Sequence, residues 1–186
     1  MEKENSDFDY VVERFADIEV LRYKVPDFDK LSLKQKKLVY YLTEAALWGR
    51  DILWDQNGKY NLPIRRLIEN VYTGYAGDKE DTEYLALEKY LKQIWFGNGI
   101  HHHYSMDKFT PEFSREFLMA EIDKLPAGKR PADTDTLLEV IFNPAVMAKR
   151  VNQAADADLI LTSANNLYDG VTQAEVEAFY NALKDT

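Results

Sequence analysis

The residues best suited to chemistry lie together in one short stretch of the chain. Residues 95–105 read Trp-Phe-Gly-Asn-Gly-Ile-His-His-His-Tyr-Ser and contain all 3 histidines and two of the 8 glycines. Imidazole rings supply metal ligands and hydrogen-bonding groups near neutral pH, and glycines let a backbone approach a ligand closely. This mixture is typical of a surface that binds something.

Zinc is the first ligand to consider at these histidines. In an extended segment His101 and His103 share one face and offer two ligands, whereas a helical zinc motif places its histidines four residues apart. The sequence has no histidine elsewhere to complete such a site. A simpler interpretation is a loop whose histidine rings bond to backbone or fill an aromatic pocket. A third interpretation is that the loop forms the wall of a binding cleft.

Composition excludes several other classes of function. Cysteine is absent, which excludes disulfides and thiolate chemistry and fits a reducing, cytoplasmic location. The net charge of −9 argues against a nucleic-acid partner and against an anionic membrane surface. The Gly97–Gly99 turn follows a predicted helix, whereas a phosphate-binding loop follows a strand and opens a helix.

Helix signals predict the elements that hold the histidine loop. Residues 82–96 have helical periodicity and end at Gly97, which is a plausible stop signal. Thr110-Pro111-Glu112 predicts the start of the next helix, reaching about Lys124. The loop is therefore expected to connect two helices.

The remaining pattern predicts a mainly α fold of about six helices with one or two short extended segments. Capping boxes at residues 32–35 and 172–175 predict helices over 33–54 and 173–183, the first with an apolar face of Leu38, Tyr41, Leu42 and Ala45. Further helices are expected over 64–75, 137–142 and 143–152, and extended segments over 15–25 and 157–163. We expect a flexible lead over 1–14 and a single helical domain over 15–186, with a linker near 126–135.

Two long blocks resemble the dipeptidyl peptidase III family, its bacterial branch in particular. The blocks are Leu31-Ser32-Leu33-Lys34-Gln35-Lys36-Lys37-Leu38-Val39-Tyr40-Tyr41-Leu42 with residues 44–52, and residues 90–105 with Asp107-Lys108-Phe109 and Pro111. Residues 165–180 are similar to a later stretch of the family. The likeness spans almost the whole chain, from about Phe15 to Thr186.

The resemblance implies a zinc metallopeptidase that releases dipeptides from peptide N-termini, with two lobes around a wide cleft. The family's zinc motif, an HExxGH-type helix with a downstream glutamate, is not in this sequence. The chain then corresponds to the N-terminal part of the lobe without metal, inactive alone and without zinc of its own. Its partners are short peptide substrates and the missing catalytic lobe of the same polypeptide.

The resemblance also implies a site. Tyr104 stands where the family carries an aromatic residue that packs on substrate, and its neighbours Asn98, Gly99, His101 and His103 complete the expected substrate-binding set. The alternative function is a stand-alone helical module that binds a peptide or protein through residues 95–104 without catalysis.

Overall fold

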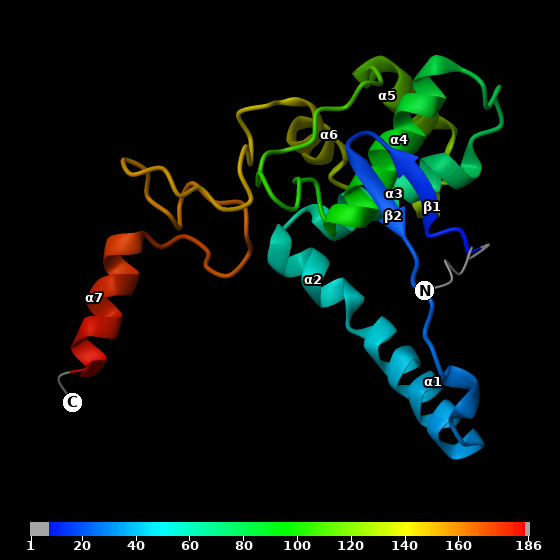
Figure 1. Cartoon of the computed structure of the whole chain (residues 1–186). Coiled ribbons are helices and arrows are strands. Elements are labelled where there is room, and N and C mark those ends of the chain that lie inside the picture. Colours follow the sequence, from blue (N-terminus) through cyan, green and yellow to red (C-terminus); the bar gives the residue numbers. More distant parts are fainter. Residues whose placement is uncertain (1–7, 185–186) are drawn as a thin grey trace. The chain divides into compact units, whose positions relative to one another are not determined.

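The computed structural model describes residues 8–184 and is mainly helical (Figure 1). This confirms the predicted fold class, because helices dominate and the strands are short. None of the described helices combines the length and the apolar character that crossing a bilayer requires. The chain divides into two compact units between Arg50 and Asp51, and they are described in turn.

The first unit opens with an antiparallel hairpin of β1 (Val11–Phe15) and β2 (Ile18–Leu21). Arg14 and Glu19 pair across the two strands at 2.8 Å. The expected lead over 1–14 falls partly on residues 1–7, which lie outside the described residues, and its last residues form β1 instead. The extended segment expected over 15–25 contains β2, which satisfies its backbone by pairing with β1.

Local signals specify α1 (Leu33–Trp48) at both ends. The Ser32 hydroxyl accepts the Gln35 amide at 3.4 Å, and the Gln35 side chain accepts the Ser32 amide at 2.9 Å, which confirms the predicted capping box. Gly49 separates α1 from α2 (Arg50–Asn57). The single helix expected over 33–54 is therefore two helices, consistent with the low helix propensity of glycine.

The prediction that the apolar face of this helix packs in the core is wrong for α1. Leu38, Tyr41 and Leu42 are 58%, 66% and 61% exposed, and none of the described residues of this helix is buried. Periodicity identifies an apolar helix but not the surface that covers it.

The core of the second unit forms around α3 (Asn61–Gly74). It contacts α4 (Thr82–Gly97), α5 (Arg115–Lys124) and α6 (Thr134–Phe142). Large apolar side chains from all four helices fill the space between them, among them Ile64, Leu67, Ile68, Leu87, Leu91, Ile94, Leu118, Leu137 and Ile141. These helices form a fixed support for the loop that leaves α4.

Two helix boundaries in this unit differ from the sequence predictions. The helix expected from Thr110 begins at Arg115, because Ser114 rather than Thr110 caps it by accepting the Phe117 amide at 3.1 Å. The expected linker over 126–135 contains a 3₁₀ turn at Ala127–Lys129 and the first residues of α6. The short helix expected over 137–142 is confirmed as α6.

The chain after α6 is mostly turns. The helix expected over 143–152 is absent, and Met147 has a φ of 51°, which a right-handed helix cannot contain. The extended segment expected over 157–163 is also wrong. There the Asp158 carboxylate accepts the amides of Ile160 and Leu161 and holds a tight turn. The last predicted helix is confirmed as α7 (Gln173–Lys184), with its Thr172–Glu175 capping box.

Candidate functional site

The histidine segment is a paired loop between α4 and α5. The Phe109 amide donates to the Ile100 carbonyl at 2.8 Å, and the His102 amide donates to the Asp107 carbonyl at 2.8 Å. His101 and Lys108 are opposite one another in this pairing. Residues 100–109 therefore form a hydrogen-bonded hairpin, called the histidine hairpin below, with residues 103–106 at its tip.

Asn98 and Gly99 turn the chain out of α4 and into the hairpin. Asn98, not Gly97, takes the left-handed conformation, with φ 50° and ψ 44°. The Gly99 amide donates to the Ile94 carbonyl at 3.1 Å and the Asn98 amide to the Trp95 carbonyl at 3.4 Å, which is the Schellman pattern. Asparagine tolerates this conformation better than most residues, so the stop signal lies one residue later than predicted.

His101 supports the hairpin from inside. Its side chain is enclosed, and its Nε2–H donates to the Met147 carbonyl at 2.7 Å. Burial lowers the pKa of this imidazole to about 4, so the ring is neutral at pH 7. Its Nδ1 atom is buried and accepts no hydrogen bond from the described residues. His101 thus bonds to backbone, which is the simpler of the interpretations that the sequence allowed for these histidines.

His102 shapes the hairpin tip, a role that the sequence did not indicate. Its Nδ1 atom accepts the amides of both Tyr104 and Ser105 at 3.1 Å. The ring therefore takes the place of a backbone acceptor in a tight turn. A histidine followed closely by small or aromatic turn residues is too weak a sequence signal to have predicted this contact.

His103 and Tyr104 form an aromatic surface at the tip. The His103 ring lies 4.4 Å from the Tyr104 ring and 5.1 Å from the Phe96 ring, measured between centroids. The Tyr104 side chain remains 83% exposed, while its own amide is held by His102. The structure thus places His101, His103 and Tyr104 on the hairpin and Asn98 and Gly99 in the turn that leads into it, with Tyr104 as the most exposed aromatic residue of the hairpin.

Lys108 fixes the second strand of the hairpin to α6. Its Nζ donates to the carbonyls of Val140 at 2.9 Å, Val146 at 2.7 Å and Asn143, which lie at the end of α6 and just after it. Burial lowers the pKa of this ammonium. The cation fits its position because carbonyl groups at a helix C-terminus carry partial negative charge.

Residues 148–150 bond to the second strand of the hairpin, and residues 164–165 bond to residues 149–150 in turn. The Lys108 amide donates to the Ala148 carbonyl at 3.1 Å, and the Arg150 amide donates to the Met106 carbonyl at 2.9 Å. Residues 149–150 in turn accept the amides of Ala164 and Asn165. A hollow of about 620 Å³ borders this array, lined in part by Tyr60, Met147, Asn165 and Asn166. The second strand of the hairpin is therefore held by these backbone bonds as well as by the Lys108 side chain.

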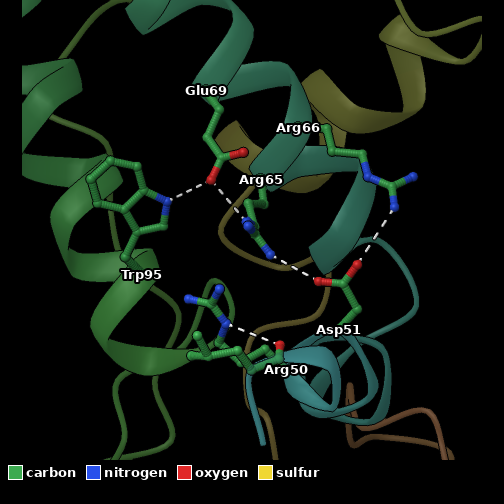
Figure 2. Close-up of polar contacts among 7 residues, drawn as sticks. Arg50, Asp51, Arg65, Arg66, Glu69 and Trp95 are labelled. Carbon is green, nitrogen blue, oxygen red and sulfur yellow. Dashed lines mark hydrogen bonds and ion pairs between the residues drawn. The ribbon is translucent and has the colours of Figure 1, made fainter. Parts of the chain in front are cut away.

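An ion network holds α2, α3 and the last turns of α4 together (Figure 2). Arg65 donates to Glu69 at 2.8 Å and to Asp51 at 3.0 Å, and Trp95 Nε1–H donates to Glu69 at 2.8 Å. Arg66 is farther from Asp51, at 3.8 Å. Since Arg65 is paired with two carboxylates and lies over the Trp54 ring, its guanidinium is engaged in structural contacts.

Two histidine nitrogens of the hairpin are engaged by backbone groups. His101 uses Nε2 on a backbone carbonyl, and His102 uses Nδ1 on two backbone amides. Among the residues that the structure describes, no group of three or more His, Asp or Glu side chains gathers as a metal site would require.

Comparison of the chain with protein-family models and with curated proteins found no match.

Proposed function

We propose that the chain is the N-terminal portion of a zinc-dependent exopeptidase similar to dipeptidyl peptidase III, which releases dipeptides from peptide N-termini in the cytoplasm. The long blocks of resemblance at residues 31–52 and 90–111 support this proposal. In it, the histidine hairpin contributes to the wall of the peptide cleft. The zinc and its ligands belong to polypeptide outside this chain.

The observation that carries the proposal is the setting of Tyr104. Tyr104 is 83% exposed, although its amide donates to His102 Nδ1 and the His102 backbone is bonded to Met106 and Asp107. An exposed aromatic ring on a rigid support binds ligands well, because little conformational entropy is lost when it packs on a partner. Tyr104 is also the residue that the resemblance assigns to substrate contact.

The surface of α1 supports a larger assembly over a stand-alone module. Its large apolar side chains are exposed all along the helix, namely Leu33, Leu38, Val39, Tyr40, Tyr41, Leu42, Leu47 and Trp48. A large exposed apolar surface usually marks a contact with another part of an assembly. The proposed occupant of this surface is the catalytic lobe of the same polypeptide, whereas a self-sufficient binding module would cover such residues itself.

The test is to read the source gene beyond the codon for Thr186 and to assay the whole product. A following HExxGH-type motif with a downstream glutamate, and release of dipeptides that stops when a chelator removes the metal, are the expected results. A stop codon, or a product without peptidase activity, would contradict the enzyme proposal. Peptide binding by the histidine hairpin would then be the function to examine.

The contribution of the hairpin has its own test in that whole enzyme. Tyr104→Ala should raise KM for short peptides about tenfold, the equivalent of one lost aromatic contact of roughly 1.4 kcal/mol. Tyr23→Ala is the matched control, since Tyr23 is also highly exposed, at 72%, but lies outside the hairpin. Equal KM values for the two variants would remove Tyr104 from the peptide site.

A further inference from the structure

Asn61, the first residue of α3, is one of very few polar side chains buried among the described residues. Its Nδ2–H donates to the Trp54 carbonyl at 3.2 Å, and its Oδ1 accepts the Ile100 amide at 3.2 Å. The side chain therefore connects the last turn of α2 to the first strand of the histidine hairpin. Both contacts are with backbone groups, so they fix the path of the chain itself.

Two glycines leave room for this amide. A Cβ atom at Gly58 would lie 2.9 Å from Asn61 Nδ2, and one at Gly99 would lie 2.9 Å from Asn61 Cγ. Gly99 also has a φ of 150°, a conformation that side chains disfavour. The backbone on either side is thus shaped around the Asn61 side chain.

The anchored position is continuous with the hairpin tip. The Ile100 amide is held by Asn61, and the Ile100 carbonyl accepts the Phe109 amide at 2.8 Å. Two residues later, His102 is paired with Asp107 and accepts the Tyr104 amide. A change in direction at Ile100 is therefore passed to the hairpin tip through these bonds, while Lys108 holds the second strand to α6.

We infer that Asn61 is a positioning residue that sets the direction of the histidine hairpin and hence the place of the Tyr104 ring. The consequence of this role for peptide binding rests on the proposed function. Asn61 itself is enclosed, so it acts through the backbone of the hairpin.

The first measurement is hydrogen exchange and amide chemical shift by NMR on the wild-type chain and on Asn61→Leu. Leucine has a similar size but neither donor nor acceptor, so exchange at Ile100 should accelerate about tenfold or more. The Tyr104 and Ser105 amides, which donate to His102, should shift or broaden. Unchanged signals for both amides in a folded Asn61→Leu chain would overturn the inference.

Asn70→Leu is the matched control. Asn70 is also on α3 and also donates to a distant backbone carbonyl, that of Lys129, at 3.2 Å. Its replacement should leave the Tyr104 and Ser105 signals in place even if stability falls. If Asn61→Leu does not fold, the wild-type chain still decides, because fast exchange at Ile100 would show that Asn61 does not hold this amide.

The peptide consequence is measured separately in the whole enzyme. Asn61→Leu should raise KM about as much as Tyr104→Ala, with a smaller change in kcat. Displaced Tyr104 signals with an unchanged KM would leave the positioning role intact and contradict the proposed peptide site. Unmoved Tyr104 signals would overturn the positioning role whatever the kinetics.

Discussion

Helices α1 and α4 have the same length, 16 residues, and both begin with a side-chain cap and carry many apolar residues. Yet α4 buries six of its residues, Tyr84, Leu87, Tyr90, Leu91, Ile94 and Gly97, and α1 buries none of those described. The difference is in what surrounds each helix, since both sequences specify a helix well. Helix formation and helix burial are thus separate properties here.

The sharpest way to test this comparison is the same substitution in both helices. Leu91→Ala in α4 removes a side chain with no exposed surface and should lower the free energy of unfolding by about 2–5 kcal/mol, because it leaves a cavity. Leu42→Ala in α1 should change it by less than about 0.5 kcal/mol. Denaturant unfolding of both variants measures this, and a large loss for Leu42→Ala would mean that α1 is covered in solution.

The second test concerns acid, and it affects only the unit that contains α4. Burial lowers the pKa of His101 from 6.5 to about 4. Between these values the unfolded chain binds a proton that the folded chain does not. Stability should therefore be full above pH 6.5 and fall by up to a few kcal/mol as the pH drops toward 4.

His101→Leu is the control for this pH effect. Its unfolding free energy should be flatter between pH 6.5 and 4.5 than that of the wild-type chain, whatever its absolute stability. An equally steep decline in the variant would assign the effect to other groups. Helix α1 has no histidine, so it supplies no competing transition in this window.

The third test compares the two caps. Asp81 accepts the amides of Glu83 at 2.8 Å and Tyr84 at 3.4 Å, and Asp81→Ala should cost about 1 kcal/mol in unfolding of the second unit. Ser32→Ala should lower helical content at α1 by circular dichroism but leave that unfolding transition unchanged. A shift of the transition by Ser32→Ala would show that α1 contributes to the stability of the second unit.

The sequence predicted what depends on neighbouring residues. The capping boxes at Ser32 and Thr172 were confirmed because the residues that form them lie within three positions of each other. The sequence predictions failed where burial or backbone conformation depends on residues far away in the chain. Leu38, Tyr41 and Leu42, expected on an apolar core face, are exposed, and the turn at Met147 replaces the helix predicted over 143–152.

The candidate site divides in the same way. That the glycine- and histidine-rich segment leaves the end of a helix was predictable, because the helical periodicity before it is clear. The roles of its members were not. Whether His101 is enclosed depends on Met147, and the direction of the hairpin depends on Asn61 and Lys108. These contacts join residues 32 or more positions apart, which periodicity and spacing do not report.

The smallest expected effect tests how complete the burial of α4 is. The Tyr90 hydroxyl is enclosed and has no hydrogen-bond partner among the described residues, and burial raises the pKa of this phenol. A buried hydroxyl without a partner keeps the cost of desolvation and gains nothing in return. Tyr90→Phe should therefore leave the free energy of unfolding unchanged or raise it by less than about 1 kcal/mol, because the ring keeps its packing against Phe113. A loss of more than about 1 kcal/mol in denaturant unfolding would contradict this expectation. It would mean that the Tyr90 hydroxyl bonds to a water molecule buried beside α4.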